Sequence, residues 1–393
     1  MSFVDDLIDY LKAKCLEEPL LKELHCLLHA DDTAILSTDR RLFIEKCNHM
    51  LDYFESNSLS LNLSKSGFIV INGKEEDKND IELKNGFLAN KKAATYLGVI
   101  ISESGNIAYD VNLFIEEKQS NVIVKYPNFC RRKFLAPLDT KLNVLNCCVS
   151  SSLTYACETW GDSNFSNIEV LYRRGLKSAL SVRPSLNNEI VYLETGEWPL
   201  KVRIVSQQLQ FWLTLQQTVL NKIDHYITKL VRIAENEELP YIIYYKNLQR
   251  EYNDKERCKQ SIEQDFRTKF EEKIREKYNS DADSRLGSYL QMNPDLQKPM
   301  YDNIIEFERV IMTRYRTGSH NLRIETGRRQ PKVERENRLC KCGLEVQTLK
   351  HCLLSCPLLD NERVTYNVQD VENGVKCIDF LVQMERILEL KCT

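Results

Sequence analysis

In the first part of the chain, hydrophobic residues recur at helical spacing in some segments and in the pattern of β-strands in others. Phe3, Leu7 and Leu11 recur at intervals of four residues, which predicts an opening amphipathic helix. Apolar residues then flank a short polar stretch within Leu24–Leu36, a pattern typical of a β-hairpin. The chain therefore begins with both kinds of secondary structure.

A second helix and two β-rich segments follow the hairpin. Asp39 can serve as the N-cap of a helix that ends near Ser56-Asn57, because apolar residues recur through it at helical spacing. Ser66–Ile71 reads as a strand followed by an Asn72-Gly73 turn, and Tyr96–Ser102 is a second β-rich run. Hairpin, helix and strands within about a hundred residues predict an α+β layer.

From about Asn112 the pattern is almost wholly helical. The apolar spacing predicts helices within Leu135–Trp160, Ser166–Leu180 and Glu194–Leu220, the last with Pro199 in a first turn that tolerates proline. Residues 221–290 alternate charges with aromatic residues and predict exposed helices. A basic, cysteine-bearing region follows at about 300–365, and Cys377–Leu390 predicts a terminal helix.

Composition excludes some classes of protein. The 393 residues carry a net charge of −3, which does not support nucleic-acid binding over the whole surface but leaves local patches possible. No apolar run approaches the roughly 18 residues of a membrane span, and the N-terminus lacks the order of a secretory signal. Fourteen cysteines without a signal indicate reduced thiols or a metal site in an intracellular protein.

Positive charge is concentrated late in the chain. Between His320 and Lys341, three glutamates are outnumbered by seven basic residues: Arg323, Arg328, Arg329, Lys332, Arg335, Arg338 and Lys341. The first six are candidate contacts to RNA or DNA phosphates, with Tyr315 and His320 available to stack on bases. Alternatively, the basic run is a solvated face, and the two aromatic rings belong to a local core.

The polar tip of the predicted hairpin is His29-Ala30-Asp31-Asp32. Two-metal nucleotidyl transfer uses carboxylates from separate strands to hold ions about 3.5–4 Å apart, and a hairpin tip exposes two such groups. An Asp-Asp pair alone more often marks a turn or a helix cap. The motifs that follow it make the metal-binding interpretation more specific.

Several of these motifs occur in one order along the chain. Asn62-Leu63-Ser64-Lys65 and Tyr96-Leu97-Gly98 follow the Asp31-Asp32 hairpin, and Tyr155–Trp160 and Glu194–Leu200 come later. In this succession the chain resembles the reverse transcriptase of non-LTR (LINE-like) retrotransposons. The resemblance starts partway through the polymerase palm and covers most of the chain.

The resemblance implies roles for individual residues. Asp31 and Asp32 would be Mg²⁺ ligands, and Lys65 would face the incoming triphosphate, where a cation assists departure of pyrophosphate. Tyr96, Leu97 and Gly98 would contact the primer backbone, so the implied partners are an RNA template and a DNA primer. The alternatives are that Lys65 is a surface lysine and that Tyr-Leu-Gly is a buried strand with a glycine bend.

Two departures from the family pattern bear on activity. His29 stands where the family has an aromatic residue beside the primer end. The fingers and the first metal-binding strand would lie before Met1, and Asp5 and Asp6 do not replace them. Half of the metal cage would then be missing, so we expect this chain to be a truncated polymerase that is inactive alone.

A second metal site is indicated near the C-terminus by Cys340, Cys342, His351 and Cys356. Three thiolates and an imidazole suit tetrahedral zinc. One residue separates the first two cysteines where two to four are usual, and Cys352 could compete as a ligand. Gly343 favours the turn that a zinc knuckle needs. The alternative is a set of buried free cysteines beside a hydrogen-bonded histidine.

The expected architecture is an α+β fold with a partial polymerase palm, a mainly helical thumb-like region and a small zinc-knuckle-like module. The predicted boundaries are 1–110 for the palm, 111–230 for the thumb, 231–299 for a helical connector, 300–365 for the CCHC region and 366–393 for the terminal helix. Three functions remain open: a truncated reverse transcriptase, a non-catalytic RNA- or DNA-binding protein derived from a retrotransposon, and a helical interaction protein that uses residues 221–290.

Overall fold

The computed structural model describes residues 6–15, 25–160, 165–221, 226–252, 258–280, 284–296, 298–299, 304–329 and 331–390. Phe3 and Asp5, which entered the sequence predictions, lie outside these residues. Helices account for 63% of the structure, and the described strands form three separate antiparallel pairs. The coarse prediction of a mixed α+β fold is confirmed, but a polymerase palm is not shown, because each described sheet has only two strands.

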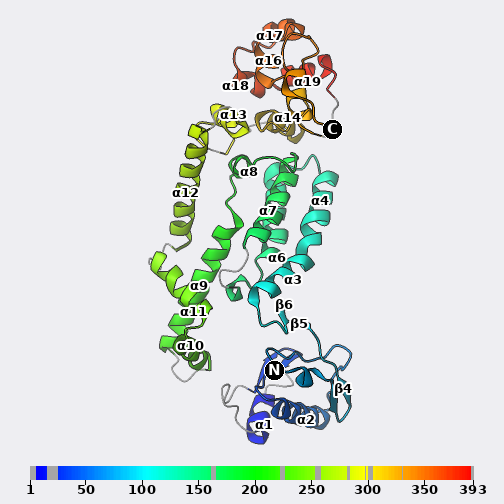
Figure 1. The fold of residues 1–393 in the computed structure, drawn as a ribbon, viewed down its shortest axis with the longest axis vertical. Coiled ribbons are helices and arrows are strands. Elements are labelled where there is room, and N and C mark those ends of the chain that lie inside the picture. Colours follow the sequence, from blue (N-terminus) through cyan, green and yellow to red (C-terminus); the bar gives the residue numbers. More distant parts are fainter. Residues whose placement is uncertain are drawn as a thin grey trace. The chain divides into compact units, whose positions relative to one another are not determined.

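The elements of the first part of the chain are α1 (Leu7–Lys14), β1 (Cys26–His29), β2 (Asp32–Ile35), α2 (Arg40–Ser56), β3 (Ile81–Leu83), β4 (Gly86–Leu88), β5 (Ala93–Tyr96), β6 (Val99–Ser102) and α3 (Ile107–Ser120). The middle holds α4 (Tyr126–Arg132), α5 (Leu138–Val144), α6 (Ser151–Leu153), α7 (Phe165–Leu180), α8 (Asn188–Thr195), α9 (Leu200–Asn221), α10 (Tyr226–Asn236) and α11 (Pro240–Glu251). The last part holds α12 (Cys258–Ser280), α13 (Arg285–Met292), α14 (Glu306–Arg316), α15 (Arg323–Thr326), α16 (Leu349–Leu354), α17 (Asp360–Thr365), α18 (Val371–Lys376) and α19 (Ile378–Ile387) (Figure 1).

The chain divides into two compact units. Unit 1 comprises residues 1–117, 158–164 and 211–247, and unit 2 comprises residues 118–157, 165–210 and 248–393. Each unit therefore combines segments that are distant in sequence.

In unit 1, helix α2 separates two small hydrophobic cores. Met50 and Tyr53 face α1 and β1, where they pack with Leu7 and Cys26. The other face of α2 places Cys47 against β3 and β4. The predicted start of this helix is confirmed, because the Asp39 carboxylate accepts a hydrogen bond from the Leu42 amide at 3.0 Å. The predicted hairpin is likewise present as β1 and β2.

Two predicted elements differ from the structure. Ser66–Ile71 is not a continuous strand, since only Phe68 forms a β-bridge, with Asn90. The single helix expected over Glu194–Leu220 is two helices: Gly196, with a φ of 68°, takes the left-handed conformation and ends α8, and α9 begins after Pro199. Glycine enters this conformation without a Cβ clash, so the two residues together break the helical path.

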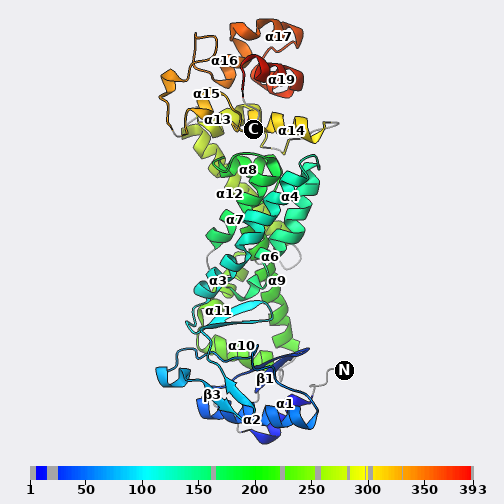
Figure 2. The ribbon, with the colours of Figure 1, turned by 90° about the vertical axis from the view of Figure 1, so that its right-hand side faces the viewer.

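In unit 2, α4 packs against α7, and the C-terminal helices form a core of their own (Figure 2). Cys340, Cys352 and Cys356 share this core with Tyr315 of α14 and Phe380 of α19. The predicted terminal helix is therefore present and packs on the cysteine-bearing region. We call residues 306–388 the C-terminal module.

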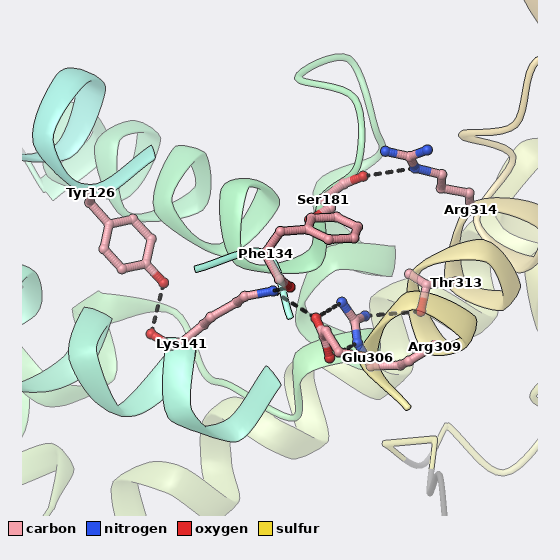
Figure 3. A network of polar contacts seen from close by, with 8 residues as sticks. All are labelled: Tyr126, Phe134, Lys141, Ser181, Glu306, Arg309, Thr313 and Arg314. Carbon is pink, nitrogen blue, oxygen red and sulfur yellow. Dashed lines mark hydrogen bonds and ion pairs between the residues drawn. The ribbon is translucent and has the colours of Figure 1, made fainter. Parts of the chain in front are cut away.

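Buried charges join the C-terminal module to the rest of unit 2. The Lys141 ammonium group on α5 donates to Glu306 at 2.7 Å, and the Arg309 guanidinium group binds the same carboxylate through two hydrogen bonds of 2.7 and 2.8 Å. Figure 3 shows these side chains converging from α5 and α14. Lys141 is fully buried, so the carboxylate compensates two cations that have little access to water.

A second buried pair repeats this arrangement between α8 and α14. The Glu194 carboxylate accepts hydrogen bonds of 2.6 and 2.8 Å from the Arg316 guanidinium group, and its side chain has no exposed surface. Such a two-bond pair fixes orientation as well as charge. Glu194 thus fixes the position of α14 relative to α8.

We predict that Glu194→Gln destabilises unit 2 by about 3–5 kcal/mol, because it leaves the Arg316 charge buried without its counter-charge. Urea unfolding followed by circular dichroism measures the change. The control is Lys376→Ala, which breaks an ion pair with Glu372 in which both side chains are more than half exposed and is expected to cost less than about 1 kcal/mol. Equal effects of the two substitutions would contradict the prediction.

Candidate metal centre and nucleic-acid surface

The four predicted zinc ligands come together in the C-terminal module. One ligand atom from each of Cys340, Cys342, His351 and Cys356 lies within 4.8 Å of all the others. The sulfur atoms of Cys340 and Cys356 are 3.7 Å apart, and Cys342 Sγ is 3.3 Å from His351 Nε2. Three of the four residues are buried. In the part of the chain that the structure describes, this is the one cluster of its kind.

A tight turn and a short helix position the ligands. Leu339 and Val346 form an antiparallel bridge, and within it the Gly343 amide donates to the Cys340 carbonyl at 2.9 Å. Gly343 has a φ of 79°, a conformation that favours glycine, so its predicted role in the turn is supported by the backbone. Thr348 then caps helix α16 by accepting a hydrogen bond from the His351 amide.

His351 is oriented by a carboxylate that the sequence pattern did not reveal. Its Nδ1 lies 3.0 Å from a carboxylate oxygen of Glu345 and 3.2 Å from the Ser355 hydroxyl. With the proton on Nδ1, the lone pair of Nε2 faces the three sulfur atoms. A histidine held in this way is typical of metal ligands, because the second hydrogen bond fixes both the tautomer and the ring plane.

The thiols of the cluster differ in acidity. Burial raises the pKa of Cys342, but hydrogen bonds from the Leu344 amide, His351 and the neighbouring thiols lower it by more, and the resulting pKa is about 7. Burial raises the pKa of Cys356 to about 12. Cys342 is therefore the thiol of this pair that more readily becomes a thiolate.

The geometry fits a tetrahedral zinc ion. Zinc–sulfur bonds of about 2.3 Å and zinc–nitrogen bonds of about 2.0–2.1 Å give ligand–ligand edges of roughly 3.8 Å for two sulfurs and roughly 3.6 Å for sulfur and nitrogen. The Cys340–Cys356 and Cys342–His351 separations are close to these values. Cys352 lies outside the four-ligand group, and burial keeps its thiol protonated by raising its pKa. These residues could therefore hold a metal such as zinc.

We predict that the purified chain binds about one equivalent of zinc and that Cys356→Ala abolishes stoichiometric binding. The metal content is measured by a chromogenic chelator after unfolding. Cys352→Ala is the matched control, because Cys352 is equally buried in the same core but lies outside the ligand group. If both variants lose zinc alike, the loss follows from disruption of the shared core, and the prediction that Cys356 is a ligand and Cys352 is not is contradicted.

The structure separates the predicted basic residues into two kinds. Arg338 is buried, and its guanidinium group donates to the carbonyls of Val333 and Ile324, so it holds the loop together and is not available to a phosphate. The other five predicted residues are exposed: Arg323, Arg328, Arg329, Lys332 and Arg335. Arg328 also pairs with Glu325, at 3.4 Å.

Tyr315 and His320 belong to the core and do not form a base-stacking platform. Their rings stack on each other with centroids 5.1 Å apart, and the residues are 1% and 5% exposed. Burial and the nearby charges of Arg183, Arg285 and Arg328 lower the pKa of His320 to about 3. The interpretation of these two rings as local core residues is therefore the one that the structure bears out.

In unit 1, Asp31 and Asp32 lie at the tip of the β1–β2 hairpin, where His29 pairs with Asp32. Both carboxylates are exposed, and Ala30 in the turn has a φ of 53°, an unusual conformation for a residue other than glycine. Among the described residues, no third acidic, cysteine or histidine side chain gathers with them into a metal-binding group. The hairpin alone therefore offers two ligands.

A second hairpin carries Tyr96, Leu97 and Gly98. Tyr96 pairs with Val99, and positive φ angles at Leu97 and Gly98 form a two-residue turn of type I′. Burial raises the pKa of Tyr96, and the Asp32 charge raises it further, so the phenol lies within electrostatic reach of the first hairpin. Both hairpins belong to unit 1.

Lys65 follows a turn in which the Asn62 carbonyl accepts from the Lys65 amide at 3.1 Å. Its side chain is exposed, as a surface lysine would be, and its carbonyl accepts a hydrogen bond from Lys91 at 3.0 Å. The turn is consistent with the local Asn-x-x-Lys pattern, whereas the predicted role at a triphosphate stays a prediction.

The chain matches no protein-family model, no curated protein and no solved structure at a significant level. No helix in the described part of the chain is both long enough and apolar enough to cross a membrane.

Proposed function

We propose that this chain is part of an RNA-directed DNA polymerase of the non-LTR retrotransposon type, with Asp31 and Asp32 as metal ligands. The observation that carries the proposal is the pair of tight hairpins in unit 1, one exposing the adjacent carboxylates of Asp31 and Asp32 and the other turning at Leu97 and Gly98 after Tyr96, in the same order along the chain as the family motifs. A divalent ion held by such carboxylates polarises a phosphoryl group and lowers the pKa of an attacking hydroxyl group.

The two carboxylates are half of the ligand set that two-metal transfer needs. Because no third ligand gathers with them among the described residues, we assign them a ligand role and no complete catalytic step. The Tyr96–Gly98 turn would hold the primer strand beside them.

We predict that the purified chain alone does not extend an RNA-templated DNA primer in Mg²⁺ or Mn²⁺, because the two carboxylates that the described residues bring together do not fix both ions. Extension of a labelled primer on a denaturing gel is the measurement. The control is the Asp31→Ala/Asp32→Ala variant. Extension by the wild-type chain that this variant loses would overturn the prediction and show a complete site.

The ligand role itself is tested by local cleavage. Fe²⁺ in place of Mg²⁺, with ascorbate and peroxide, generates hydroxyl radicals that cut the chain near the bound ion. With a primer–template present, we expect cleavage near His29–Asp32 that competing Mg²⁺ suppresses and that Asp31→Ala/Asp32→Ala abolishes. Cleavage that persists in this variant, or none near the hairpin, would reject the polymerase proposal.

The second candidate is non-catalytic binding of RNA or DNA by the C-terminal module. It is favoured by the assembled zinc ligands next to five exposed basic residues, because phosphate contacts dominate the affinity of nucleic-acid binding. This function would operate with or without polymerase chemistry.

We predict that Arg329→Gln/Arg335→Gln weakens the binding of single-stranded RNA and reduces the slope of log affinity against log salt by roughly 1.4, or about 0.7 for each phosphate that is no longer neutralised. Fluorescence anisotropy at several salt concentrations measures both quantities. The charge-matched control is Lys376→Gln/Arg386→Gln, at two exposed positions outside the basic run. An equal loss of affinity in the two variants would indicate a general effect of net charge and count against this surface.

A further inference from the structure

An open cavity of about 550 Å³ lies in unit 2 between helices that are distant in sequence. Lys277 and Ser280 line it from the end of α12, Ser284 and Arg285 from the start of α13, and Arg328 from the turn after α15. No carboxylate is among the described residues that line it. The lining therefore combines three cations with small hydroxyl groups.

The positive charge of this cavity is only partly neutralised by the described residues. Glu325 pairs with both Arg285 and Arg328, so one carboxylate is shared between two guanidinium groups. Lys277 pairs with Glu189, which also attracts Lys273. The described pairs thus leave a local excess of positive charge, which favours an anion.

A further cation close by increases this excess. Arg183, two residues before the lining residue Ser185, donates to Asn321 at 3.0 Å. Burial and the like charge of Arg329, with those of Arg285 and Arg314, lower the pKa of Arg183 to about 10, although Glu325 opposes the shift. Several arginines therefore repel one another here, and a bound anion would relieve the repulsion.

Arg285 also has unused hydrogen-bonding capacity. Its Nε is buried, and no atom of the described residues accepts a hydrogen bond from it. This Nε is enclosed by protein beside Gly318, so a phosphate would contact the terminal nitrogen atoms of the guanidinium group instead. Those atoms share the Glu325 carboxylate with Arg328, and a guanidinium group suits the several acceptor oxygens of a phosphate.

We propose that this cavity binds a backbone phosphate of single-stranded nucleic acid through Lys277, Arg285 and Arg328. The inference rests on the proposed nucleic-acid-binding function and assigns residues of α12 and α13 to the surface, in addition to the basic run. An open cavity allows an extended backbone to pass across it, whereas a small free anion would gain more from an enclosed site. Arg328 belongs to both the basic run and the cavity and therefore joins them into one path.

The test variant is Lys277→Gln/Arg328→Gln. The side chains of Lys277 and Arg328 are nearly half exposed, whereas that of Arg285 is 27% exposed, so the fold tolerates this change better than a substitution of Arg285. The charge-matched control is Lys273→Gln/Arg386→Gln. Lys273 lies on the same helix and faces the same Glu189 as Lys277, but it does not line the cavity. Thermal unfolding confirms that both double variants are folded.

Anisotropy with a labelled single-stranded RNA measures the affinity of each variant across a series of salt concentrations. We expect the cavity variant to lose roughly tenfold in affinity at physiological salt and roughly 1.4 in the salt slope, with the control within about twofold of wild type. The charge-preserving swap Lys277→Arg/Arg328→Lys should retain most of the affinity. A parallel titration with inorganic phosphate measures whether the free anion competes with RNA.

The outcomes separate this proposal from the one on which it rests. If the wild-type chain binds RNA but the cavity variant matches the control, the cavity proposal is overturned and the proposed binding function stands. If the wild-type chain binds no RNA, both are overturned. If inorganic phosphate binds to the wild-type chain and not to the cavity variant, while RNA affinity is unchanged between them, the cavity takes a free phosphate and the backbone assignment is wrong.

Discussion

The position of α14 depends on charges that are buried in pairs. Glu306 and Glu194 contact cations at opposite ends of this helix, and in each case the carboxylate is compensated inside the protein. Buried pairs add little net stability compared with apolar packing, because both charges lose their hydration. Their effect is on specificity: a shift of α14 by one turn would leave several charges without partners. The C-terminal module is therefore attached in one register.

This attachment also connects two segments that looked unrelated in the sequence. Glu194 begins the Glu194–Leu200 motif, whereas Arg316 follows Tyr315, one of the two aromatic residues that the sequence offers for stacking on bases. The structure pairs them at 2.6 Å and stacks Tyr315 on His320 beside them. A sequence segment rich in cationic and aromatic residues can thus belong to a core, in which the polar groups bond to other residues of the protein. The exposed residues of the basic run are the better candidates for binding.

The sequence predicted those features that depend on local chemistry. The Asp39 cap, the α2 helix and the hairpin around Asp31 follow from spacing and capping within a few residues, and the grouping of the four candidate metal ligands follows from their spacing in a short segment. Features set by distant contacts were not predictable in this way. The burial of Arg338, the contact of Glu345 with His351 and the cavity beside Arg285 each require the folded arrangement. The helix break at Gly196 was missed because Pro199 was assigned to the first turn of a single helix beginning at Glu194.

Helix α2 has a mechanical consequence for the Asp31-Asp32 hairpin. One face of the helix contacts β1 and the other contacts β3, with Ile35 of β2 packed against both cores. Close-packed side chains transmit displacement, because they have no free volume in which to absorb it. Any force on the hairpin tip, such as the pull of a ligand, would pass through α2 to the β3–β4 pair on its far side. Helix α2 would then couple the positions of two small sheets that share no hydrogen bond among the described strands.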